Sequence, residues 1–206
     1  MTQTLCVYHS SFNQLPRLAK LAAIALPLAC VIPLGQAADL PPRSAQFPSR
    51  VEQLKAHIER VDQRAEQLRA PEFPSGKDWF NSPPLTFDKQ LAGKITVLDF
   101  WTYCCINCIH ILPDLAELEE RYAGFPVAFV GVHSAKFDNE KVSANIRDAV
   151  LRYEIAHPVV NDDTMHMWQR IGVRSWPSMA VVGPKGNLML MVSGEGNKEV
   201  IDACIT

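Results

Sequence analysis

The segment Ile95-Thr-Val-Leu-Asp-Phe-Trp-Thr-Tyr-Cys-Cys-Ile-Asn-Cys108 determines how this 206-residue chain can fold. Its first six residues, 95–100, form a short and mostly apolar run, which predicts a strand buried on both faces. From Cys105 to Tyr122, apolar residues recur at helical spacing, and this pattern predicts a helix. Two cysteines are therefore expected where a buried strand gives way to a helix.

The sequence after this segment continues to alternate between strand and helix patterns. Short apolar runs predict strands at 127–132 and 157–160, and helical periodicity appears near 142–153 and 165–171. A glycine-containing turn then joins two further strands in a hairpin, 179–182 and 188–192. This order of elements predicts an α/β sandwich with a mixed central sheet.

The first 38 residues are predicted to form a signal peptide. Arg17 and Lys20 precede an apolar stretch at residues 21–34, and small residues follow at 35–38. A basic flank, a short apolar core and a small-residue exit are typical of a secretory signal. The apolar stretch is shorter than the roughly 20 residues that a membrane-spanning helix needs. We therefore expect export to the periplasm or an equivalent extracytoplasmic compartment, with no membrane association beyond the signal segment.

Residues 39–70 are predicted to hold a linker and an amphipathic helix. The stretch 39–50 is rich in Pro and Ser, as linkers often are. Apolar residues then recur at spacings of three and four, which predicts a helix from Val51 to Leu68. The main domain is expected to cover residues 71–206, and its last helix, near 197–206, is short enough to suggest truncation.

The composition narrows the classes of function. The net charge is −2 with no basic run, which gives no electrostatic case for binding nucleic acid. Three of the six cysteines crowd into positions 104–108, whereas a disulfide scaffold would spread its cysteines over several loops. This clustering points to redox or metal chemistry.

The position of the cysteines at a helix start explains how they could act as a redox pair. Unpaired backbone N–H groups and the positive end of the helix dipole favour a thiolate at Cys105. Cys108 lies one helical turn further on, so its sulfur can reach that of Cys105. We assign Cys105 as the attacking thiolate and Cys108 as the resolving thiol. Asp99 is an acid in an apolar strand, and burial should let it accept the proton of Cys108.

Other uses of the cysteines remain open at this point. Cys104, Cys105, Cys108 and His110 supply four potential zinc ligands, but no second Cys/His pair follows downstream. Haem attachment requires a histidine directly after the last cysteine, where this chain has Ile109. A purely structural disulfide would be poorly placed at a helix start.

Two alternative functions also remain open. Thr102 lies three residues before Cys105, as in peroxiredoxins, but Leu98 occupies the place of the proline that such a peroxidase motif contains. The domain could instead be a non-catalytic redox-sensing or docking module whose partner is recognised elsewhere. We expect no metal and no bound cofactor.

The motif from Val97 to Cys108, followed by Pro113, resembles a thioredoxin active site. The resemblance implies a three-layer sandwich with helices on both faces of the sheet. It makes Asp99 the buried acid of the family, and it makes Trp176 and Pro177 the cis-proline loop that binds substrate backbone beside the redox pair. Cys104 stands where thioredoxin has a tryptophan, which makes it a candidate modulator.

Further segments resemble narrower groups within this family. Residues 131–140, 158–162 and 194–196 resemble the TlpA-like branch of exported thioredoxin-like proteins. The Cys-Cys-Ile-Asn-Cys motif with residues 132–137 and 150–153 is similar to the thioredoxin-like domain of NHL-repeat-containing proteins of the plant suppressor-of-quenching type. The resemblance implies a thiol–disulfide oxidoreductase whose partners are disulfide-containing exported proteins and a thiol reductant. The propeller that follows this domain in the NHL group has no counterpart in this sequence.

Overall fold

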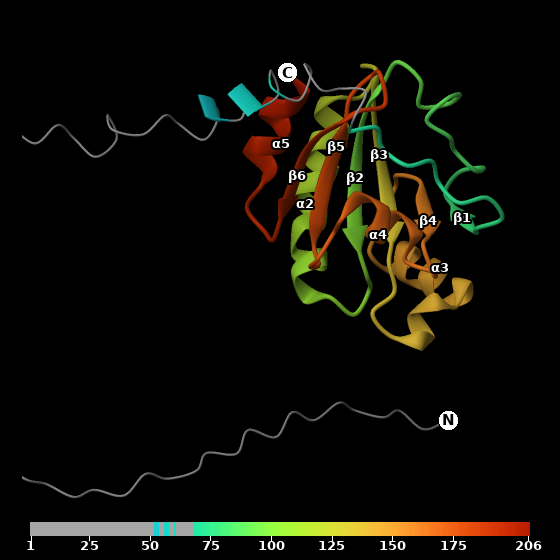
Figure 1. The fold of residues 1–206 in the computed structure, drawn as a ribbon. Helices are drawn as coiled ribbons and strands as arrows, with labels where there is room; N and C mark the ends of the chain where they lie inside the picture. The colour runs from blue at the N-terminus through green and yellow to red at the C-terminus, as the bar shows by residue number, and fades with distance from the viewer. Residues whose placement is uncertain (1–51, 54–55, 58–59, 61–67) are drawn as a thin grey trace, which may run out of the picture. The chain divides into compact units, whose positions relative to one another are not determined.

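The computed structural model describes residues 52–53, 56–57, 60 and 68–206 of the chain (Figure 1). The predicted signal peptide, the linker and most of the predicted helix from Val51 to Leu68 lie outside the described residues. Within that range, residues 52–53, 56–57 and 60 are helical, whereas Leu68 lies in a bend. No helix in the described part of the chain is long and apolar enough to cross a membrane.

A six-stranded mixed sheet forms the centre of the domain, with the strand order β1-β4-β3-β2-β5-β6 (Figure 1). The strands are β1 (Trp79–Phe80), β2 (Ile95–Trp101), β3 (Val127–His133), β4 (Val159–Asn161), β5 (Ser178–Val182) and β6 (Leu188–Ser193). Strand β2 lies in the interior, parallel to β3 and antiparallel to β5. The predicted mixed sheet is confirmed, and the cysteine motif follows one of its interior strands.

Helices cover both faces of this sheet, as the resemblance implied. They are α2 (Ile106–Arg121), α3 (Ser143–Arg152), α4 (His166–Ile171) and α5 (Lys198–Ile205), with a short 3₁₀ helix at Asp138–Lys141. Helix α4 packs with Leu98 and Phe100, whereas α2 and α5 pack with Val97 on the opposite face of β2. Side chains alternate between the two faces of a strand, so β2 contributes to the core on both sides.

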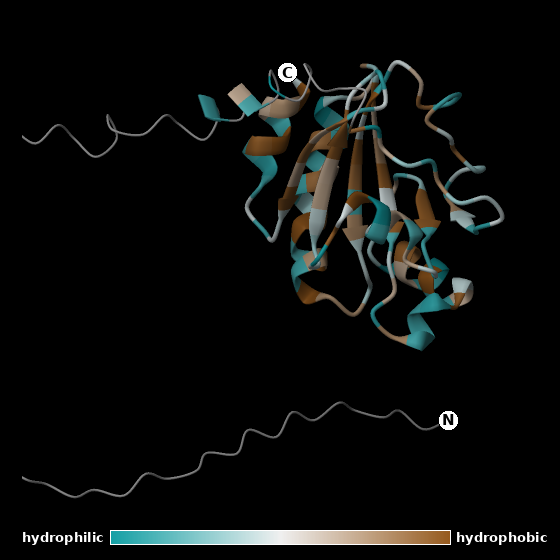
Figure 2. Cartoon of the chain, viewed as in Figure 1, coloured by the Kyte–Doolittle hydropathy of each residue, from teal (hydrophilic) through white to brown (hydrophobic). Residues whose placement is uncertain are grey.

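The sequence of β2 accounts for its buried position. Six of its seven residues are buried, and the strand contains the β-branched and aromatic residues that pack well on a pleated surface. Figure 2 shows apolar residues along the strands, with hydrophilic residues gathered on helices and loops. Burying a Leu or Phe side chain contributes about 1.5–3 kcal/mol, so β2 is held firmly behind the motif that follows it.

Three features differ from the sequence-based expectations. Strand β1 and the 3₁₀ helix were not predicted, because elements this short leave no clear periodicity. The strand predicted at 157–160 is shifted to Val159–Asn161, after Pro158, whose carbonyl accepts a hydrogen bond from the Gly131 N–H at 2.8 Å.

The segment just before the predicted domain start also belongs to the packed structure. Residue Arg69 forms an antiparallel bridge with Asn187 in the β5–β6 turn. The Ala70 N–H donates to the Gly186 carbonyl and the Leu188 N–H to the Leu68 carbonyl, each at 2.8 Å. Residues 68–70 therefore pair with the hairpin turn.

Candidate active site

Cys105 and Cys108 lie at the junction of β2 and α2, where the sequence placed them. Cys105 is the N-cap residue of α2, with extended backbone, and its sulfur accepts a hydrogen bond from the Cys108 N–H at 3.3 Å. Accepting a backbone N–H in this position is the role of an N-cap side chain. Cys105 is partly exposed, whereas Cys108 is fully buried. A disulfide partner from solution can therefore reach Cys105 but not Cys108.

Burial also separates the chemistry of the two thiols. Burial raises the pKa of the Cys108 thiol strongly, and its hydrogen bond with Cys105 and the nearby charge of Asp99 raise it further. Cys108 consequently remains a thiol at neutral pH unless a neighbouring base removes its proton.

Asp99 is a buried acid whose charge acts on that thiol. It lies on β2 with only 2% of its surface exposed, and neither carboxyl oxygen has a hydrogen-bond partner among the described residues. Burial raises its pKa to about 7, while the charge of His157 lowers it and that of Glu119 raises it. Asp99 can therefore take up and release a proton near neutral pH, as a general base requires.

The Trp176–Pro177 peptide bond is cis, as the resemblance implied. Ser178 follows directly and pairs with Phe100 at the end of β2 from which the cysteine loop leaves. Trp176 donates from Nε1 to the Ser134 carbonyl at 3.0 Å and packs on the same apolar cluster as Cys105 and Cys108. The proline loop and the cysteine loop thus meet at one end of the sheet.

Glu140 is a site residue that sequence reasoning did not single out. Its carboxylate is completely buried and accepts hydrogen bonds from the Thr102 hydroxyl at 2.5 Å and the Cys104 N–H at 3.2 Å. It also accepts from the backbone N–H groups of Lys136 and Phe137. Burial alone would raise the pKa of Glu140, but these donors outweigh it and the pKa is lowered. Glu140 therefore ties the loop before Cys105 to the 3₁₀ helix.

His133 lies beneath the same loop. Its ring is completely buried, stacks on Tyr103 at 5.4 Å and meets Trp101 edge-to-face at 5.0 Å. Burial lowers its pKa to about 4, so the ring is neutral at physiological pH. His133 is a core residue that supports Tyr103.

Cys104 is exposed on the loop. Its backbone N–H donates to the buried Glu140 carboxylate. Across the described residues, no group of three or more His, Cys, Asp or Glu side chains is arranged to hold a metal ion.

Comparison with known proteins assigns the class. Residues 93–188 match the family model described as thioredoxin-like, and these residues hold β2, the cysteine motif and the proline loop. A crystal structure of a thioredoxin-like superfamily protein superimposes with a TM-score of 0.56 at 25% identity, covering 67% of this chain and 94% of that one. Residues 93–188 therefore form a thioredoxin-like domain.

More specific relatives bear out the narrower resemblance. The chain is 52% identical over 157 residues to the chloroplastic protein SUPPRESSOR OF QUENCHING 1 of Arabidopsis thaliana, covering 76% of this chain and 15% of that protein. It is 52% identical over 145 residues to NHL repeat-containing protein 2 of Bos taurus, covering 69% and 20%. The thiol-disulfide oxidoreductase YkuV of Bacillus subtilis is 20% identical over 64% of this chain and 88% of its own length. The chain thus spans only a fifth or less of the first two relatives.

Proposed function

We propose that this chain is an exported thiol–disulfide oxidoreductase that acts on protein disulfides through Cys105 and Cys108. One observation carries the proposal: a partly exposed cysteine caps a helix directly beside a buried cysteine, and a carboxyl with a pKa of about 7 lies behind the pair. A structural thiol pair has no need of such a base. The thioredoxin-like fold and the relative named as a thiol-disulfide oxidoreductase support the same chemistry.

The reaction proceeds by two exchanges. In the first, the Cys105 thiolate attacks one sulfur of the substrate disulfide, the substrate S–S bond breaks, and one substrate thiolate leaves. In the second, Asp99 accepts the proton of Cys108, and the Cys108 sulfur attacks the Cys105 sulfur of the mixed disulfide. The second substrate thiolate leaves, and the pair is oxidised by two electrons while the substrate is reduced. An external thiol reductant returns the pair to its starting state.

The proline loop supplies the proposed substrate contact. Because Trp176 is partly exposed and packs on the same cluster as Cys105, we place an extended substrate segment against the backbone of Trp176, with its disulfide facing the exposed sulfur. No bound cofactor takes part in this scheme. The proposed partners are exported proteins with disulfides and a thiol reductant.

An insulin-reduction assay tests the function. The reduced protein should reduce insulin disulfides stoichiometrically, and the Cys105→Ser variant should not. A folded wild-type protein that leaves insulin intact would instead favour a redox-sensing or docking role. Consumption of hydrogen peroxide without insulin reduction would favour a peroxidase.

A further inference from the structure

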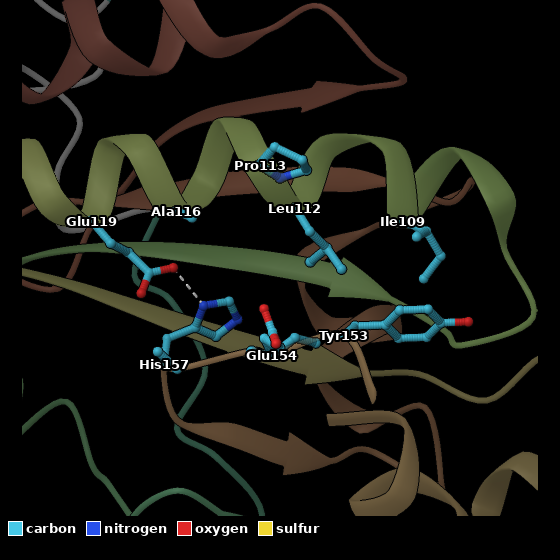
Figure 3. A pocket seen from close by; sticks show the side chains of 10 residues that line it. Ile109, Leu112, Pro113, Ala116, Glu119, Tyr153, Glu154 and His157 are labelled. Atoms are coloured by element: carbon cyan, nitrogen blue, oxygen red, sulfur yellow. Dashed lines mark hydrogen bonds and ion pairs between the residues drawn. The ribbon is translucent and has the colours of Figure 1, made fainter. Parts of the chain in front are cut away.

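A cavity of about 340 Å³ opens between α2 and the segment 153–157 (Figure 3). Most of its lining is apolar and includes Ile109, Leu112 and Pro113 from α2. Two titratable side chains, Glu119 and His157, meet in its wall, and neither was assigned a role by the sequence. The next contacts place this pair between the cavity and Asp99.

Glu119 and His157 form a closely held pair. The Glu119 carboxylate lies 2.6 Å from Nδ1 of His157, and only 5% of the His157 side chain is exposed, against 22% for Glu119 (Figure 3). Because a carboxylate can only accept a hydrogen bond, Nδ1 is the donor and Nε2 is the acceptor nitrogen of the neutral ring. In the part of the chain that the structure describes, Nε2 is buried and has no hydrogen-bond partner.

The unpartnered nitrogen points toward the backbone beside Asp99. A Cβ atom placed on Gly131 would lie 3.2 Å from His157 Nε2 and 3.1 Å from Trp101 Nε1. Gly131 is the register partner of Asp99 in the parallel β2–β3 pair, and side chains at paired positions lie on the same face of a sheet. The missing side chain at Gly131 therefore leaves the imidazole next to the face that carries the Asp99 carboxyl.

The electrostatic environment of Asp99 agrees with this arrangement. After burial, the charges of His157 and Glu119 have the largest effects on the pKa of Asp99, the first lowering it and the second raising it. From α2, Cys108 also faces Asp99, because the Asp99 charge raises the pKa of that thiol. From β3 and β5, the neighbours in register are Gly131 and Met179, which do not titrate.

We propose that His157, oriented by Glu119, carries the proton from Asp99 to the solvent in the cavity during the resolution step. This inference rests on the proposed oxidoreductase function. Asp99, having taken the proton of Cys108, passes it to Nε2 of His157. That transfer regenerates the Asp99 carboxylate, and the proton on Nδ1 then moves to Glu119 and from there to water. Glu119 thus both orients the ring and carries the proton to solvent. When the external thiol reduces the pair, the reverse transfers return the proton to Cys108 and the ring to its Nδ1–H form.

Stopped-flow reaction with 5,5′-dithiobis(2-nitrobenzoate) separates the two exchanges. In a Cys104→Ser background, attack by Cys105 releases a first thionitrobenzoate and resolution by Cys108 a second. His157→Ala should slow the second phase about tenfold or more without slowing the first, because it removes an acid–base group from that step alone. Added imidazole should restore the second phase. The second phase of His157→Gln, which keeps a hydrogen bond but cannot titrate, should stay slow. The rate of the second phase in Glu119→Gln should lie between those of the wild type and His157→Ala.

Glu154→Gln is the matched control, because Glu154 lines the same cavity but is exposed and is separate from the Glu119–His157 pair. It should leave both phases unchanged. A His157→Ala variant whose second phase keeps the wild-type rate and pH midpoint would overturn the relay. If the wild-type protein itself releases no second thionitrobenzoate, the oxidoreductase function fails instead.

Titration of the Asp99 carboxyl by ¹³C NMR gives a readout that does not need turnover. Replacing His157 by Gln removes the electrostatic interaction that lowers the pKa of Asp99, so the midpoint should move upward from its wild-type value near 7. An unchanged midpoint in the folded His157→Gln protein would also contradict the proposal.

Discussion

The backbone N–H of Cys108 donates a hydrogen bond to the sulfur of Cys105 across 3.3 Å. The two sulfurs nevertheless lie in different environments, because that of Cys105 is at the helix start and partly exposed while that of Cys108 is completely buried. Cys105 can be reached from solution, whereas Cys108 can only attack what Cys105 has already bound.

The two cysteine variants should therefore lose different steps of the reaction. Cys105→Ser should abolish attack on disulfide substrates, since a serine hydroxyl without a base is a poor nucleophile. Cys108→Ser should still attack but not resolve, and should accumulate mixed disulfides seen as reducible adducts on non-reducing gels. Iodoacetamide should label Cys105 before Cys108 in the reduced wild type. Trapping of partners by the Cys105→Ser variant would reverse the assignment.

Asp99→Asn should slow the reaction and stabilise the fold at alkaline pH. The pKa of Asp99 in the folded state, about 7, lies above the unfolded value of 3.8, so the folded protein binds more protons between these values. Stability is therefore lost as pH rises from about 4 to about 7, by at most about 4 kcal/mol. At pH 8, Asp99→Asn should raise the free energy of unfolding in urea titrations and slow resolution in stopped-flow traces. Equal free energies of unfolding of the wild type and Asp99→Asn at pH 8 would show that the Asp99 carboxyl is not charged in a buried site.

Glu140→Gln should loosen the loop before Cys105. The amide that replaces the carboxylate cannot accept all four donors, and disrupting buried charge-assisted hydrogen bonds costs about 3 kcal/mol. The pKa of Glu140 is lowered in the folded state, so this stabilisation is present above its unfolded pKa and is lost as pH falls through the folded one. Urea unfolding at pH 7 and pH 4 measures the difference in free energy of unfolding between the wild type and Glu140→Gln. This difference should be smaller at pH 4.

Asp138→Asn is the control for this experiment, because Asp138 lies on the same 3₁₀ helix and pairs with Lys141 at the surface. It should leave the unfolding midpoint unchanged. Equal effects of the two variants would mean that Glu140 acts only through the general charge of the segment.

Peptide mapping of the oxidised protein should find a Cys105–Cys108 disulfide. Adjacent cysteines rarely bond to each other because the required geometry strains the backbone, so Cys104 should not pair with Cys105. A dominant bond from Cys104 to Cys108 or to Cys204 would give Cys104 a direct redox role in place of the modulating one proposed.

The predicted signal peptide can be tested on the native protein. Mass spectrometry of the mature chain should find an N-terminus near Ala38, in an extracytoplasmic fraction. A cytosolic protein that keeps Met1 would contradict the proposed export.

The sequence predicted the elements whose signals are local. The apolar run of β2 and the helical spacing of α2 each extend over several residues, so the junction that carries Cys105 could be placed to within one residue. The two residues of β1 form a strand only because β4 lies beside them, and no local pattern records that pairing.

Candidate site residues could be predicted where they lie in one segment of the sequence. They could not be predicted where the contacts join distant segments. Asp99 could be singled out because an acid in an apolar strand is conspicuous. Glu140 contacts Thr102 across 38 positions, and His157 lies near Asp99 only because β3 has a glycine between them. Such contacts depend on strand register and loop path, which a single sequence does not fix.

The pairing of residues 68–70 with the β5–β6 turn bears on where the chain can be cut. A recombinant fragment that starts at residue 71 would lose the Arg69–Asn187 bridge and leave the Gly186 carbonyl and the Leu188 N–H without their partners. Buried or half-buried backbone groups left in this way destabilise a fold. A fragment for biophysical work should therefore begin before Leu68, and limited proteolysis of the intact chain should spare the bonds from 68 to 70.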